Sequence, residues 1–146
     1  MKSIPTKEEI YCYGMPEEEY AVQHFYGKSE EEAAELFFLY PEYYGSDLRW
    51  MGVKAYFYYI GSIKKYLQSE EGKSDDIFID IVVDTLKSRL ERELDFRSAF
   101  KKEKDNILNI LVLIKSIIEQ KKFNEIDNFY EDLPSKVINL IELCKK

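Results

Sequence analysis

The sequence has few of the residues that carry the common chemistry of protein sites. It holds two cysteines, Cys12 and Cys144, near opposite ends of the 146-residue chain, and one histidine, His24. Two cysteines so placed form neither a disulfide framework nor a zinc-ligand spacing. No phosphate-binding glycine loop, dinucleotide fingerprint or serine-nucleophile elbow is present. We therefore expect no cofactor and no bound metal.

Long apolar runs are also absent. The longest apolar block covers residues 107–118 and is interrupted by Asn109, Lys115 and Ser116. A membrane-spanning helix needs about 18 or more uncharged apolar residues, and no segment offers them. The first nine residues, MKSIPTKEE, lack the apolar centre of a signal peptide. The sequence predicts a cytoplasmic protein with reduced thiols.

Positive charge is scarce in the first third of the chain. Residues 1–50 contain 4 Lys or Arg and 11 Asp or Glu, whereas residues 51–146 contain 17 of each, for a net charge of −7. Phosphate backbones and anionic membrane surfaces are bound through Lys and Arg. The charge therefore predicts neither a nucleic-acid nor a membrane partner. A basic protein partner is compatible with it, although solubility is the ordinary explanation.

Apolar residues recur at helical spacing along most of the chain. No segment alternates as a strand does, and no hairpin turn or internal repeat is present. The length suits one domain, so we predict a single all-α domain over residues 1–146 with about six or seven helices. Its centre is a predicted continuous helix over residues 47–67, apolar around most of its circumference. Its apolar residues are Trp50, Val53, Tyr56, Phe57, Tyr59, Ile60, Ile63, Tyr66 and Leu67.

Local signals predict where the other helices begin and end. Thr6–Glu9 and Ser29–Glu32 have the form of capping boxes, and Pro16 before three glutamates is typical of a helix start. Gly27 is expected to close the helix that Pro16 begins. Helices are also predicted over residues 75–94 (capped by Ser74), 107–122 and from 134, with turns at 41–46, 68–74 and 95–104 and a short segment at 124–131.

Two groups of residues are candidate binding sites. Glu17, Glu18 and Glu19 are consecutive acids that could meet a basic protein. Tyr and Arg are enriched at interface hot spots, and they cluster around the predicted central helix. The candidates in this second group are Tyr43, Tyr44, Arg49 and Tyr58. For the tyrosines, burial in the core remains an equally good explanation.

His24 is a further candidate binding residue and the one candidate for catalysis. A general base is usually oriented by a carboxylate, and Glu18 or Glu19, one to two turns earlier in the same helix, could serve. A lone histidine at a helix end is more often a packing or capping residue. No second catalytic motif accompanies it, so we assign no catalytic residue.

Residues 24–67 carry three motifs, H-F-Y-G-K-S-x-E-E-A-x-x-L-F, Y-Y-x-x-D-L-x-W-M-G and A-Y-F-Y-Y. Together they resemble a family of small bacterial cytoplasmic proteins of unknown function. Ser46 departs from the pattern, which has an acid at that position. The resemblance implies a bacterial source and no mechanism.

Three functions follow as hypotheses. The leading one is a non-enzymatic, acidic protein-binding module of the immunity or antitoxin kind, which masks a basic partner through its N-terminal third. The second is a homo-oligomeric helical scaffold or a small-ligand-binding protein. The third and weakest is an enzyme that uses His24.

Overall fold

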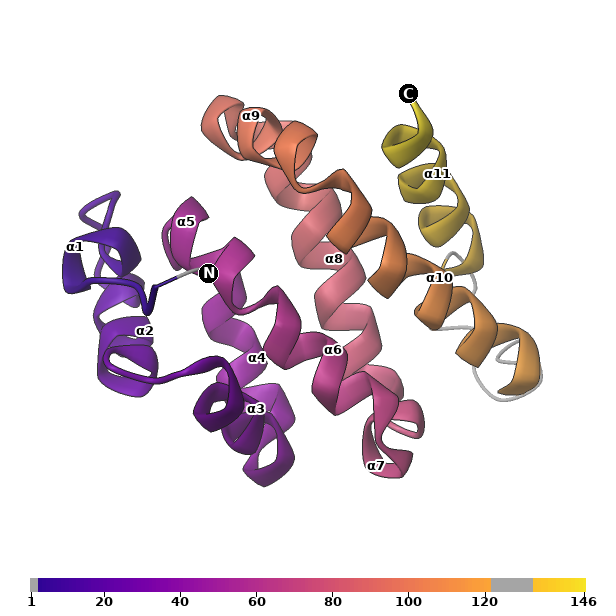
Figure 1. Cartoon of the computed structure of the whole chain (residues 1–146), viewed down its shortest axis with the longest axis horizontal. Coiled ribbons are helices and arrows are strands. Elements are labelled where there is room, and N and C mark those ends of the chain that lie inside the picture. Colours follow the sequence, from indigo (N-terminus) through magenta and orange to yellow (C-terminus); the bar gives the residue numbers. More distant parts are fainter. Residues whose placement is uncertain (1–2, 122–132) are drawn as a thin grey trace.

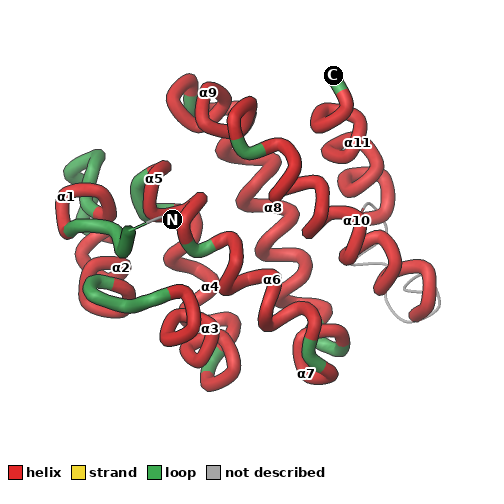
Figure 2. The backbone as a smooth tube through the Cα atoms, in the orientation of Figure 1, coloured by secondary structure: helices red, strands yellow, loops and turns green. Residues whose placement is uncertain are grey.

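The computed structural model describes residues 3–121 and 133–146 of the chain. These residues form helices and short loops without any strand, as Figure 2 shows by colour. This confirms the all-α class. Several helices are only one or two turns long, so the described residues hold more of them than predicted. In chain order the elements are α1 (Lys7–Ile10), α2 (Glu17–Phe25), α3 (Glu30–Leu39), α4 (Pro41–Gly45), the 3-10 helix η1 (Ser46–Arg49), α5 (Val53–Tyr58), α6 (Ile60–Gln68), α7 (Glu70–Lys73), α8 (Asp76–Arg92), α9 (Leu94–Lys102), α10 (Lys104–Lys121) and α11 (Leu133–Lys145).

The helices lie side by side across the molecule. Figure 1 shows α1 and α2 at one side and α11 at the other, with α6 and α8 between them. Helix α6 packs against α3 and α10, while α8 packs against α4 and α11. The buried apolar side chains form one continuous cluster from α1 to α11, as expected of a single domain.

The predicted capping boxes are confirmed. Thr6 caps α1 and Ser29 caps α3, and in each box the glutamate three residues later accepts from the backbone N–H of the capping residue. Gly27 follows α2 with a positive φ of 77°, which glycine adopts at little cost. These helix ends could be predicted from the sequence because each depends on contacts between residues at most four positions apart.

The continuous helix predicted over residues 47–67 is wrong. The segment is divided into η1, α5 and α6, with a turn around Gly52. The Gly52 N–H donates to the carbonyl of Ile10 at 2.9 Å. A β-carbon on Gly52 would overlap the carbonyl oxygen of Glu9 and the sulfur of Cys12. Close packing of α1 against this turn therefore requires glycine there.

Most of the apolar residues in that segment are nevertheless in the core, as predicted. Trp50, which lies in the turn, and Val53, the first residue of α5, are the exceptions, because each is only half-buried. The hydroxyl of Tyr59 donates to the carbonyls of Phe25 and Lys28, both at 2.9 Å. Tyrosine therefore supplies apolar area and ties the segment to neighbouring loops. The buried members are Tyr56, Phe57, Tyr59, Ile60, Ile63, Tyr66 and Leu67.

The three turns predicted at 41–46, 68–74 and 95–104 are largely helical. Pro41 begins α4, since proline suits the first helical position. Ser69 caps α7 by accepting from the Gly72 N–H at 3.0 Å. Asp75 rather than Ser74 caps α8. The segment predicted at 124–131 lies outside the described residues.

Within residues 3–121 and 133–146, no helix is long and apolar enough to cross a membrane. The same residues contain no group of three or more His, Cys, Asp or Glu side chains placed to hold a metal ion. Cys12 is exposed, Cys144 is buried, and both are free thiols.

Candidate functional site

His24 lies at the meeting point of α2, α4 and η1. Its Nδ1 is 2.6 Å from Oδ2 of Asp47, and its Nε2 is 3.2 Å from the hydroxyl of Tyr43. The ring centroids of Tyr43 and Tyr44 are 4.9 and 5.0 Å from that of His24. The structure thus brings together three of the predicted site residues and adds Asp47, which the sequence analysis did not assign to the site.

Two short elements create this arrangement. Helix α4 begins at Pro41 and presents Tyr43 and Tyr44 on successive positions beside the imidazole. The following 3-10 helix directs Asp47 inward, where only 4% of the residue is exposed. The prediction that Glu18 or Glu19 orients His24 is wrong. The carboxylate comes instead from Asp47, 23 residues along the chain, where no local spacing rule could find it.

Electrostatics explain what this pair does. Burial raises the pKa of the Asp47 carboxyl, while the hydrogen bond to His24 acts in the opposite direction. A separation of 2.6 Å between Nδ1 and Oδ2 is short for a nitrogen–oxygen hydrogen bond. A buried pair of this kind adds little net stability, because desolvation offsets the attraction. Its clearest effect is geometric, since it directs Nε2 of His24 toward Tyr43.

A carboxylate, an imidazole and a hydroxyl in series also have the form that general-base catalysis uses. Here Tyr43 occupies Nε2, so both ring nitrogens of His24 already have partners. A nearby surface cavity is bounded by Lys7, Tyr11, Glu19, Val22 and Gln23 and does not include His24. The arrangement is therefore better suited to holding Tyr43 than to activating a substrate.

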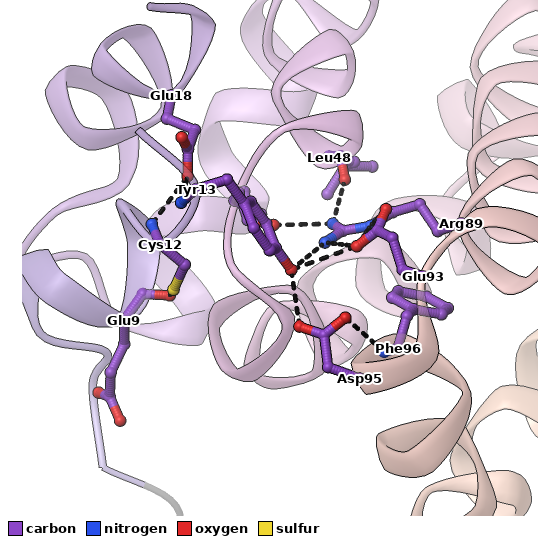
Figure 3. A network of polar contacts seen from close by, with 10 residues as sticks. Glu9, Cys12, Tyr13, Glu18, Leu48, Arg89, Glu93, Asp95 and Phe96 are labelled. Carbon is purple, nitrogen blue, oxygen red and sulfur yellow. Dashed lines mark hydrogen bonds and ion pairs between the residues drawn. The ribbon is translucent and has the colours of Figure 1, made fainter. Parts of the chain in front are cut away.

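The three consecutive glutamates do not form one acidic surface. Glu18 is fully buried and accepts backbone N–H bonds from Cys12 at 2.7 Å, Tyr13 at 2.8 Å and Met15 at 2.6 Å. Figure 3 shows its carboxylate directed at this loop. Its assignment as a partner-binding residue is corrected, because the carboxylate is used to shape the loop between α1 and α2.

The other two glutamates differ from Glu18 and from each other. Glu19 is exposed, whereas Glu17 is half-buried. One carboxylate oxygen of Glu17, Oε2, is buried without a hydrogen-bond partner. Only Glu19 is therefore fully presented to solvent.

The remaining predicted site residues lie apart from His24. Arg49 pairs with Asp84 of α8 at 2.8 Å, with both side chains nearly half exposed. Tyr58 is half-buried on α5 and lines a cavity of about 490 Å³ with Val53 and Phe57. Such a volume is within the range of small-molecule sites.

A polar network that the sequence analysis missed surrounds Arg89, which is 2% exposed. Its guanidinium donates to the carbonyls of Leu48 and Met51, at 3.0 and 2.7 Å, and to the carboxylate of Glu93 at 2.9 and 3.0 Å. It also donates to the hydroxyl of Tyr13 at 3.3 Å, as Figure 3 shows. Arg89 thus donates hydrogen bonds to backbone carbonyls at the turn between η1 and α5, where the predicted central helix is interrupted. The i, i+4 spacing of Arg89 and Glu93 was the available signal.

Exposed aromatic side chains continue outward from His24. Tyr20 lies one turn before His24 on α2, and Tyr40 lies one turn before Tyr43 at the start of α4. Tyr20 is 57% exposed and Tyr43 is 56% exposed. We call Tyr20, His24, Tyr40 and Tyr43 the tyrosine face. Glu42, beside Tyr43 in α4, is exposed and adds negative charge.

Comparisons with protein-family models, with curated proteins and with solved structures give no match to this chain. The resemblance of residues 24–67 to a family of small bacterial proteins therefore stays a prediction.

Proposed function

We propose that the chain is a non-enzymatic, protein-binding module and that the tyrosine face is its interface. The observation that carries the proposal is the fixed position of an exposed side chain. Tyr43 is held by His24, which is held in turn by the buried Asp47. The buried carboxylate of Asp47 and the imidazole of His24 thus hold the solvent-exposed side chain of Tyr43 in place.

Fixing an exposed tyrosine favours binding in two ways. Tyrosine offers a large amphipathic surface and is enriched at interface hot spots. A side chain that is already ordered loses less conformational entropy when a partner covers it. The arrangement of Tyr43 therefore suits an interface anchor better than a residue that only finishes the surface.

Charge indicates the kind of partner. Glu19 and Glu42 are exposed on the two helices that carry the tyrosine face, and residues 1–50 hold the whole negative excess of the chain. Complementary charge speeds encounter and selects among partners. The proposed partner is a basic protein, and the proposed role remains that of a cytoplasmic immunity- or antitoxin-like module that masks it.

The test is affinity capture of the tagged chain from its own host, at low and high salt, with three variants in parallel. Tyr43→Ala and Tyr20→Ala should each reduce recovery of a stoichiometric basic protein by about tenfold, the loss expected when a hot-spot anchor is truncated. Tyr26→Ala is the matched control, since Tyr26 is 56% exposed and lies outside the tyrosine face. Equal recovery with all three variants, or no retained protein, would refute the proposal.

A small-ligand-binding role is the second candidate, and the cavity beside Tyr58 supports it. Its walls include Val53, Phe57 and Ala99, and Lys102 lies at its edge. Ala99→Phe should fill part of the cavity and lower any ligand-induced rise in the thermal midpoint. The rival homo-oligomeric scaffold is tested by native mass over a range of concentrations, where a constant monomer mass would exclude it.

A further inference from the structure

A second surface feature lies where α8, α9, α10 and α11 meet. It is a groove of about 370 Å³ whose apolar floor is formed by Leu90, Phe100 and Leu143. Figure 1 shows α9 and the end of α11 well apart from α2 and α3. The groove is thus separate from the tyrosine face. Its remaining lining residues are all basic: Arg97, Lys101, Lys104 and Lys146.

The lining contrasts with the composition of the chain. The sequence has 28 acidic and 21 basic residues, yet none of the described residues that line this groove has a carboxylate side chain. Two neighbouring acids are already engaged, since Glu91 pairs with Lys87 and Glu93 pairs with Arg89. Within the described part of the chain, none of the four lining cations forms an ion pair. Their charge is therefore available to an anion from outside.

Two of the cations lie at the helix ends that border the groove. The guanidinium of Arg97 donates through Nε to the carbonyl of Leu90 and through a second nitrogen to that of Glu91. These bonds hold the side chain at the groove and leave further donors free. Lys104 is the first residue of α10 and lies two residues after the carboxyl end of α9, where the helix dipole favours positive charge.

We propose that this groove binds a small anionic amphiphile, meaning a single alkyl chain that ends in a carboxylate or phosphate monoester. The head group contacts Lys101, Lys104 and Arg97, and the alkyl chain covers the apolar floor. Small-ligand sites combine a mainly apolar wall with a few polar groups that fix orientation, and this groove has both. The net charge of −7 disfavours attachment of the whole molecule to an anionic membrane, so a single amphiphile suits the groove better.

The first experiment titrates the full chain with decanoate and with decyl phosphate, below their micelle concentrations, by calorimetry. Decanol and decyltrimethylammonium have the same tail and serve as head-group controls. We expect saturable 1:1 binding of one or both anions, with at least about tenfold weaker binding of the neutral and cationic compounds. Equal binding of decanol would show a merely apolar surface and overturn the proposal. Binding of neither anion would also overturn it.

The second experiment locates the site. The double variant Lys101→Gln/Lys104→Gln should weaken anion binding by about tenfold, because two charge-assisted contacts are lost. Lys73→Gln/Lys115→Gln removes the same charge from exposed or half-buried lysines outside the groove and should leave binding unchanged. If both doubles weaken it equally, the attraction is diffuse and the groove is not the site.

The tail contact is tested with Leu143→Ser, which changes an exposed side chain and should leave the fold intact. We expect amide signals of Phe100, Lys101 and Leu143 to shift on decanoate addition, and the shifts to need more ligand in Leu143→Ser. Sedimentation with anionic phospholipid vesicles provides the last arm. Retention on vesicles without binding of monomeric amphiphile would assign the groove to a membrane surface and refute the proposal.

Discussion

The two sides of this molecule are stabilised in different ways. In the region from α1 to α6, the core contains both aromatic rings and buried polar groups. Hydrogen bonds there join segments that are distant in sequence. Tyr59 reaches back to α2 and Ser62 donates to the carbonyl of Glu30 at 2.7 Å. Where α10 meets α11, the buried side chains are almost entirely aliphatic. They are Ile107, Ile110, Leu111, Ile114, Ile117, Ile118, Leu133, Val137, Leu140, Ile141 and Cys144.

The difference predicts how each region responds to mutation. Aliphatic cores tolerate changes that keep volume and polarity, because their contacts are not directional. Buried polar groups are less tolerant, since removing one partner leaves the other desolvated and unpaired. Buried polar groups on the N-terminal side also position surface residues. Asp47, for example, orients His24, which in turn holds Tyr43. The N-terminal side should therefore combine the largest stability effects with the binding function.

The largest effect is expected for Arg89→Met. The substitution removes donors from the carbonyls of Leu48 and Met51 and from Glu93, all at a buried position. Breaking a buried ion pair from one side costs about 3–5 kcal/mol, which we expect as the drop in the free energy of unfolding in urea. Arg92→Met on the exposed side of the same helix should change it by less than about 0.5 kcal/mol. Equal effects of the two would show that the network is not stabilising.

The next effect is that of Glu18→Ala. Three backbone N–H groups between α1 and α2 lose their acceptor, so the free energy of unfolding should fall by about 1–3 kcal/mol. Glu19→Ala, which changes an exposed neighbour, serves as the control. Hydrogen exchange at Cys12, Tyr13 and Met15 should accelerate in Glu18→Ala alone. Unchanged exchange at these amides would contradict the role of Glu18 in shaping the loop.

A smaller pair of substitutions compares the two regions directly. Tyr59→Phe removes only a hydroxyl, yet it takes this donor from the carbonyl of Lys28 and leaves that of Phe25 with only the Lys28 N–H. We expect a loss of about 1–2 kcal/mol, as for other unsatisfied buried groups. Ile114→Val removes one methylene from the aliphatic side and should cost about 0.5–1.5 kcal/mol. The informative readout is hydrogen exchange around residues 25–28, which should accelerate only in Tyr59→Phe.

The smallest effect on stability is expected for Tyr43→Ala. The side chain is exposed, so the free energy of unfolding should change by less than about 0.5 kcal/mol. Its effect should appear instead in partner capture, as proposed above. A loss of stability as large as that of Tyr59→Phe would mean that Tyr43 is part of the core packing and not a binding anchor.

Local sequence signals predicted much of the fold. The capping boxes at Thr6 and Ser29, the helix start after Pro16 and the buried positions of α6 all depend on residues within one or two turns. The short helices α4 and α7 were missed because each is too brief to show a helical period. Helix α9 was missed because charged residues interrupt its apolar pattern. Adjacent side chains satisfy the backbone groups at the ends of such helices. At the start of α7, for example, the Ser69 side chain accepts from the Gly72 N–H.

The candidate site was predictable only in part. His24, Tyr43 and Tyr44 were identified as candidates from residue type, and the structure places them in contact. Asp47 was instead expected at the start of the central helix. Glu18 was expected at the surface because it lies among other acids. Neither error could be corrected from the sequence, because burial depends on the loop and on the helices packed over it.

By itself, the sequence determined that the chain is helical and which positions are apolar, because helical periodicity and capping are local properties of a few consecutive residues. The tertiary structure decided where the central segment is broken, since the close packing of α1 on Gly52 and the reach of Arg89 join residues about 40 positions apart. It also decided which carboxylate meets His24 and which cations share a groove. Such pairings depend on distances through space, and no spacing along the chain specifies them.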